Sequence, residues 1–128
     1  MCDKCYQSGF NTPEEFTLEG EFGKYVWDVT SASRMIHPGR KTYNIPSSVV
    51  RSLLVHAKIE PLHTRHVDPT KPGILAKIGT RVALIDGAHR ALRCLEENRP
   101  FTAYLLSSRE SEACMVKRPG FRTRHPAA

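Results

Sequence analysis

The sequence predicts a single α+β domain built on a small mixed β-sheet. Short runs rich in Val, Ile and aromatic residues alternate with segments whose apolar residues recur at helical spacing. The length of 128 residues suits one domain whose core needs neither metal nor disulfide.

Residues 1–39 are expected to form an N-terminal extension packed on the domain. Their first half is rich in turn formers and charges, with isolated apolar anchors rather than a continuous element. These anchors are Phe10, Phe16 and Leu18. Residues 24–29 favour a short strand and residues 30–36 a helical turn, which the His37-Pro38-Gly39 sequence ends.

The domain itself is expected to span residues 40–117. Its predicted elements are a strand at 41–45, a helix after Pro46, strands at 74–78 and 81–85, a helix over 88–95, a strand at 101–106 and a helix from 107 to about 116. Gly79-Thr80 is the expected hairpin turn. Ser47 or Ser48 is a candidate cap for the first helix, and Ser107 with Glu110 resembles a capping box.

Apolar spacing supports both longer helices. One stripe consists of Val49, Val50, Leu53 and Leu54, and the other of Ala88, Ala91, Leu92 and Leu95. Residues 61–70 are expected to be extended or loop. Residues 118–128 are expected to form a flexible basic tail.

The charge of the chain is unevenly distributed. Residues 1–30 contain two lysines and six carboxylates, a net charge of −4. Because the whole chain has a net charge of +6, the remaining residues carry +10. A basic body favours an anionic ligand such as a nucleotide or nucleic acid. The sequence has no apolar run near the roughly 20 residues that span a bilayer and no signal-peptide pattern, so a cytoplasmic protein with free thiols and no membrane partner is expected.

The most informative segment runs from Leu84 to Leu92. A predicted strand turns through Gly87 into a helix whose first turn carries His89 and Arg90. Cations at a helix N-terminus are unfavourable unless an anion neutralises them, and a phosphate could bind the exposed amides there. The alternative is that Asp86 caps the helix and pairs with Arg90.

The order of a strand, the sequence Asp86-Gly87-Ala88-His89-Arg90, a helix and a further strand resembles the ParB/sulfiredoxin superfamily. The upstream sequence Tyr43-Asn44-Ile45-Pro46 is similar to the opening strand of that family, so the resemblance covers about 40–117. It implies a small α+β fold whose Gly87-Ala88-His89-Arg90 loop holds nucleotide phosphates or a nucleic-acid backbone. Arginine suits this role because its planar fork donates two parallel hydrogen bonds.

The sequence departs from the family pattern at positions that matter for two of the family's activities. Ala88 stands where sulfiredoxins carry their catalytic cysteine, and Cys94 lies too far along the helix to replace it. The chain also ends soon after the loop, without the helix-turn-helix region of partition proteins. Lys71, in Asp68-Pro69-Thr70-Lys71, resembles a sulfiredoxin lysine that helps to bind ATP.

The leading functional hypothesis is a binder of ATP or CTP with Mg²⁺, acting as a phosphotransferase on a small hydroxyl metabolite or as a nucleotide hydrolase. His89 and Arg90 would stabilise the transferring phosphate, and Asp86 or Asp68 would position the metal ion or the hydroxyl.

The alternative is a DNA-binding or nuclease-like regulator that grips a backbone phosphate with the same loop. Basic residues would assist it, namely Arg93, Lys117, Arg118, Arg122 and Arg124. A third possibility is a domain that binds a protein through its acidic leader. Cys2 and Cys5 have the spacing of half a zinc site, and His63 and His66 could supply the other half, but the spacing between the two pairs matches no zinc pattern, so no metal site is predicted.

Overall fold

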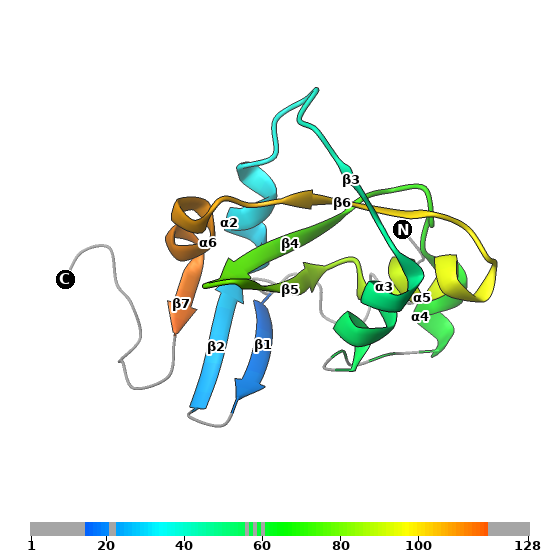
Figure 1. Ribbon diagram of the computed structural model, residues 1–128, viewed down its shortest axis with the longest axis horizontal. Coiled ribbons are helices and arrows are strands. Elements are labelled where there is room, and N and C mark those ends of the chain that lie inside the picture. The colour runs from blue at the N-terminus through cyan, green and yellow to red at the C-terminus, as the bar shows by residue number, and fades with distance from the viewer. Residues whose placement is uncertain (1–14, 21–22, 56, 58, 60, 118–128) are drawn as a thin grey trace.

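A computed structural model describes residues 15–20, 23–55, 57, 59 and 61–117 (Figure 1). In chain order the elements are β1 (Glu15–Gly20), β2 (Gly23–Asp28), α2 (Val29–Arg34), β3 (Tyr43–Ile45), α3 (Ser47–Leu54), α4 (Pro61–His66), β4 (Gly73–Ile78), β5 (Arg81–Asp86), α5 (Ala88–Glu96), β6 (Phe101–Leu105), α6 (Ser108–Ala113) and β7 (Met115–Lys117). The strands form a four-stranded and a three-stranded sheet.

The four-stranded sheet has the order β3-β6-β4-β5 and is mixed. β4 and β5 form the antiparallel hairpin expected around Gly79-Thr80, whereas β4 pairs with β6 in parallel after the α5 crossover. Two parallel strands need such a crossover because the chain must return from the end of the first strand to the opposite end of the sheet, where the second strand begins. The α+β class with a small mixed sheet is therefore confirmed.

The second sheet joins the two ends of the described chain. β1 and β2 form an antiparallel hairpin, and β7 pairs with the other edge of β2. The strand predicted at 24–29 and the helical turn at 30–36 are confirmed as β2 and α2. β1 was not expected, because only Phe16 and Leu18 signalled it.

The four-stranded sheet has a hydrophobic cluster on each face. On one face, Ile74, Ala76 and Ile85 pack with Trp27 of β2 and Ala32 of α2. The described part of the segment expected as an extension therefore contributes to the core.

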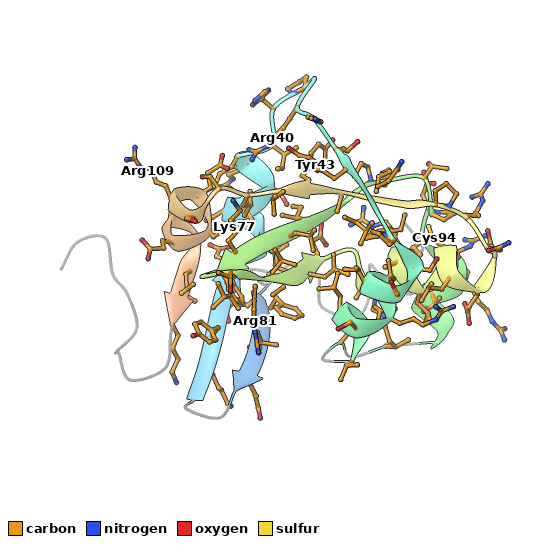
Figure 2. All side chains as sticks on the ribbon, viewed as in Figure 1. Arg40, Tyr43, Lys77, Arg81, Cys94 and Arg109 are labelled. Atoms are coloured by element: carbon orange, nitrogen blue, oxygen red, sulfur yellow. The ribbon has the colours of Figure 1, made fainter. Side chains whose placement is uncertain are left out.

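On the opposite face, helices α3 and α5 cover part of the sheet. Leu75, Leu84 and Phe101 pack with Val50 of α3 and with Cys94 of α5, which is labelled in Figure 2. Most residues of the two predicted helical stripes thus face a single cluster, but Val49 is exposed and Leu92 lines the space between α4 and α5.

Three local expectations were wrong. Residues 61–66 form α4 rather than a loop, with proline at the first helical position, where its missing amide proton costs nothing. Helix α3 begins after Pro46 without a side-chain cap from Ser47 or Ser48. The last helix ends at Ala113, and the chain continues into β7 because that strand has a partner in β2.

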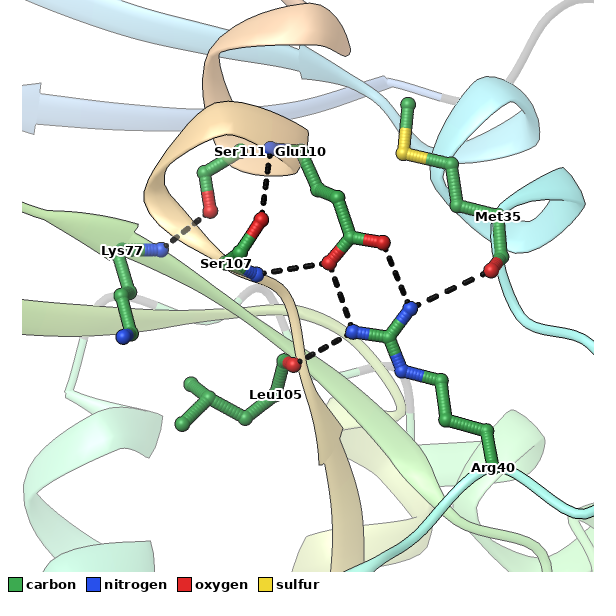
Figure 3. A network of polar contacts seen from close by, with 7 residues as sticks. All are labelled: Met35, Arg40, Lys77, Leu105, Ser107, Glu110 and Ser111. Carbon is green, nitrogen blue, oxygen red and sulfur yellow. Dashed lines mark hydrogen bonds and ion pairs between the residues drawn. The ribbon is translucent and has the colours of Figure 1, made fainter.

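The predicted capping box at the start of α6 is confirmed and extends into a larger network (Figure 3). Ser107 Oγ accepts from the amide of Glu110, while Glu110 Oε1 accepts from the amide of Ser107 at 2.8 Å. Both oxygens of Glu110 also accept hydrogen bonds from Arg40, at 2.7 and 2.8 Å.

Arg40 completes this network with two backbone acceptors. Its guanidinium donates to the carbonyl of Leu105 at 2.8 Å and to that of Met35 at 3.3 Å. One side chain therefore ties the loop after α2 to the end of β6 and the start of α6.

Candidate functional site at the amino end of helix α5

The predicted strand-to-helix corner is present. β5 ends at Asp86, Gly87 adopts the left-handed conformation with φ 97° and ψ 17°, and α5 begins at Ala88. The first intrahelical bond runs from the amide of Ala91 to the carbonyl of Gly87 at 2.8 Å. Within the described part of the chain no side chain caps this end, and no acidic residue lies in the first turn, so the corner presents amides suited to an anion.

Glycine at position 87 also has a role in packing. A β-carbon there would lie 2.8 Å from Cα of Gly73, closer than real contacts allow, and 3.4 Å from Nε and Nη2 of Arg90. The conformation and this close approach both require glycine, independently of any ligand. The guanidinium of Arg90 therefore lies beside the turn.

Arg90 pairs with Asp86 across one helical turn. Nη2 donates to Oδ2 at 3.0 Å, and both side chains are largely buried. This confirms half of the alternative weighed from the sequence: Asp86 pairs with Arg90, but the cap position belongs to Gly87. Nε and Nη1 of Arg90 make no hydrogen bond within the described residues.

The structure brings Asp68 within reach of the charge of Arg90. Asp68 Oδ1 accepts hydrogen bonds from the hydroxyl and the amide of Thr70, and these bonds hold the pKa of Asp68 below its usual range. Lys71 and Arg90 lower the pKa of the same carboxyl through their charges. The expected site residues from two separate segments are thus within electrostatic reach of one another.

Arg93 has a structural role that the sequence did not reveal. Its Nη1 donates to the carbonyls of Arg65 and Val67, at 3.1 and 2.6 Å, and its Nε pairs with Glu97 at 2.7 Å. The guanidinium therefore satisfies carbonyls at the end of α4. These bonds occupy donors that the DNA-binding alternative assigned to phosphate.

Cys94 also holds α5 against the preceding loop. Its thiol is buried and donates to the carbonyl of Pro69 at 3.3 Å, and burial raises its pKa. A protonated buried thiol is a poor nucleophile, so Cys94 is a packing residue.

The remaining predicted residues are scattered. Ala88 and His89 are partly buried, and His89 interacts with other groups of the protein. Lys117 is exposed at the end of β7, far along the chain from the corner. Several candidates lie outside the residues or side chains that the structure describes, namely Cys2, Cys5, His63, Arg118, Arg122 and Arg124.

Two cavities lie away from the corner. One of about 420 Å³ is lined by α4 and α5 residues including Thr64, Leu92 and Glu96. The other, of about 520 Å³, lies between β1, α3 and β5 and includes Phe16 and Val49 in its lining. Neither of these two cavities is lined by Gly87 or Arg90.

Replacing Gly87 by alanine should lower the free energy of unfolding by about 2 kcal/mol, because it combines left-handed strain with a backbone collision. Gly79→Ala is the matched control. Gly79 has φ 59°, but a β-carbon there meets nothing within 4 Å. Urea denaturation of both variants should show the smaller loss, about 1 kcal/mol, for Gly79→Ala. Equal losses would show that the approach to Gly73 carries no cost.

Comparison with known proteins identifies no relative: no protein-family model, no curated protein and no solved structure matches the chain. Among the described residues, no helix combines the length and apolar character needed to cross a bilayer. The same residues contain no cluster of three or more His, Cys, Asp or Glu side chains that could hold a metal ion.

Proposed function

We propose that the protein binds a nucleoside triphosphate, ATP or CTP, at the corner formed by Gly87, Ala88, His89 and Arg90. The observation that carries the proposal is the left-handed glycine followed by a helix start that no described side chain caps, beside a guanidinium two of whose nitrogens make no hydrogen bond to the described residues. A phosphate oxygen would accept from the first-turn amides and from Arg90.

The carboxylates near Arg90 are compatible with a Mg²⁺ ion that arrives with the nucleotide. Magnesium in nucleotide sites is commonly held by one or two carboxylates together with phosphate oxygens and water. Asp86 and Asp68 would supply such carboxylates, and Lys71, whose charge acts on Asp68, would add a cation to the site. The reaction class consistent with these groups is transfer of the terminal phosphate to a small hydroxyl compound or to water.

The contacts of Arg93 favour a nucleotide over a DNA backbone at this corner. A DNA backbone would be gripped by a row of cations, and Arg93 is the next cation along α5. Its guanidinium is instead bonded to two carbonyls and a carboxylate. A compact triphosphate requires only the first turn of the helix.

The test is isothermal titration with ATP, CTP and GTP in the presence of Mg²⁺. We expect Arg90→Gln to raise the Kd of the preferred nucleotide about tenfold or more, because a charge-assisted hydrogen bond contributes roughly 1.5–3 kcal/mol. Arg99→Gln is the control, since Arg99 also pairs with a nearby carboxylate but lies beyond the end of α5. Its Kd should stay within about twofold of the wild type.

Two results would contradict the proposal. One is the absence of binding of any nucleotide to the folded wild type. The other is binding that Arg90→Gln leaves unchanged. Release of inorganic phosphate, measured with the same variants, then tests the reaction class separately from binding.

A further inference from the structure

Part of one face of the four-stranded sheet is left uncovered by the described helices. Side chains on a strand alternate between faces, so Tyr43 lies on the same face as Ile45, and Lys77 on the same face as Leu75. Helices α3 and α5 pack on Ile45 and Leu75 but leave Tyr43 exposed.

The strand register extends this uncovered area across the sheet. Leu105 pairs with Leu75, and Val82 pairs with Lys77. Because paired residues point to the same side of a sheet, Leu105 and Val82 lie on this face as well. Figure 3 shows the side chains of Lys77 and Leu105 beside the network that anchors α6, where Ser111 Oγ accepts from the amide of Lys77 at 2.8 Å. We call the surface formed by Lys41, Tyr43, Lys77, Val82 and Leu105 the open sheet face.

Exposed apolar side chains occur on both edge strands of this sheet, with Tyr43 on β3 and Val82 on β5. Tyr43 is 44% exposed and Val82 37% exposed, and Val49 of the bordering helix α3 is 39% exposed. These are three of the four large hydrophobic side chains that are exposed among the described residues. Among them, Tyr43 offers the largest exposed apolar surface, an aromatic ring that a partner can contact.

The charge of the open sheet face is positive. Lys41 places its Nζ 5.1 Å from the centre of the Tyr43 ring, and the strand register puts Lys77 on the same face as Tyr43. The four strands contain one carboxylate, Asp86, which lies at the end of β5 and is paired with Arg90. Glu110, near the end of β6, is neutralised by Arg40.

We infer that the open sheet face binds single-stranded nucleic acid. A base would stack on Tyr43, whose ring is polarised by Lys41, while Lys41 and Lys77 would contact phosphates. Aromatic rings on a sheet flanked by cations suit single strands, because unpaired bases expose their faces for stacking. The net charge of +6 also favours a nucleic acid over a protein partner whose surface has few acidic residues. This surface is separate from the corner at Gly87 and Arg90.

Fluorescence anisotropy with labelled oligo-dT and oligo-U of about 12 nucleotides tests the inference, at roughly 50 and 200 mM salt. Tyr43→Ser should weaken binding about tenfold or more, whereas Tyr43→Phe, which keeps the ring, should stay within about twofold. Lys77→Gln should weaken binding and reduce the salt slope by about one.

Two matched variants control for the general basic charge of the protein. Arg109→Gln removes an exposed cation from α6, and Arg90→Gln alters the nucleotide corner. Both should stay within about twofold of wild-type oligonucleotide binding. Circular dichroism establishes that each variant is folded.

Three results would overturn the inference. The first is oligonucleotide binding that Tyr43→Ser and Lys77→Gln do not weaken. The second is binding that only Arg90→Gln abolishes, which would move the nucleic acid to the corner. The third is a wild-type dimer in sedimentation, without oligonucleotide binding, that Tyr43→Ser dissociates, because the face would then bind a second copy of the chain.

Discussion

Replacement of Trp27 by alanine should lower the free energy of unfolding by about 4 kcal/mol, the largest effect we expect from a single substitution. Trp27 is 0% exposed and belongs to the cluster that joins β2 and α2 to the four-stranded sheet. Its ring lies 5.8 Å from that of Tyr25 and 6.2 Å from that of Phe16. Alanine would leave a cavity that these neighbours can close only in part.

Trp27→Phe separates the cost of the cavity from that of the indole nitrogen. Nε1 of Trp27 is buried and has no hydrogen-bond partner in the described part of the structure. Phenylalanine removes that donor while keeping most of the apolar ring, so we expect a loss of about 1–2 kcal/mol. A loss as large as that of Trp27→Ala would show that the indole is essential for another reason.

The same tryptophan reports whether residues 15–36 fold together with the rest of the domain. Trp27 is the single tryptophan of the chain, so its fluorescence follows β2, whereas far-ultraviolet circular dichroism follows all the helices. Because the core is shared, we expect the two signals to show unfolding transitions with the same midpoint in urea. Separate transitions would mean that these residues unfold as an independent extension. Trp27→Ala itself is measured by circular dichroism.

Replacement of Arg40 by methionine should lower the free energy of unfolding by about 3 kcal/mol at pH 7. The side chains of Arg40 and Glu110 are 17% and 30% exposed, and they meet through two hydrogen bonds. Methionine keeps much of the aliphatic stem but leaves the Glu110 carboxylate without its cation. The carbonyls of Leu105 and Met35 also lose a donor.

This ion pair predicts a specific dependence on pH. Hydrogen bonds from Arg40 lower the pKa of Glu110 from 4.5 to about 2. A carboxyl whose folded pKa is lowered stabilises the protein above its unfolded pKa, and that stabilisation disappears as the pH falls through the folded value. The difference in stability between wild type and Arg40→Met should therefore be constant above pH 5 and shrink between pH 4.5 and 2.

Urea denaturation at several pH values measures this difference, with Arg109→Met as the control. Arg109 is exposed on the same helix and pairs with no carboxylate among the described residues. Its variant should be close to wild type in stability and should follow the wild-type pH profile. A wild-type advantage over Arg40→Met that persists unchanged at pH 2 would contradict the lowered pKa of Glu110.

Elements with a strong local signal could be predicted from the sequence. The hairpin of β4 and β5 needs only apolar runs around Gly79-Thr80, and α5 needs only its repeating apolar stripe. The capping box of α6 also lies within four consecutive residues. In each case the interactions that form the element lie within a few positions of one another.

Elements that depend on a distant partner could not be predicted in this way. β7 has three residues and therefore no detectable periodicity, and its pairing with β2 joins segments almost ninety residues apart. Helix α4 has six residues and begins at a proline, and carbonyls at its end accept hydrogen bonds from Arg93 of α5. No local pattern indicates such contacts.

The same distinction applies to the candidate site. The sequence by itself determined the corner, because a glycine between a strand and an amphipathic helix defines a turn whose amides are exposed. Only the tertiary structure decided the surroundings of that corner: it paired Arg90 with Asp86, brought Asp68 within reach of the charge of Arg90, and engaged Arg93 elsewhere. Backbone conformation follows from neighbouring residues, whereas the partners of a long charged side chain depend on which segments the folded chain brings together.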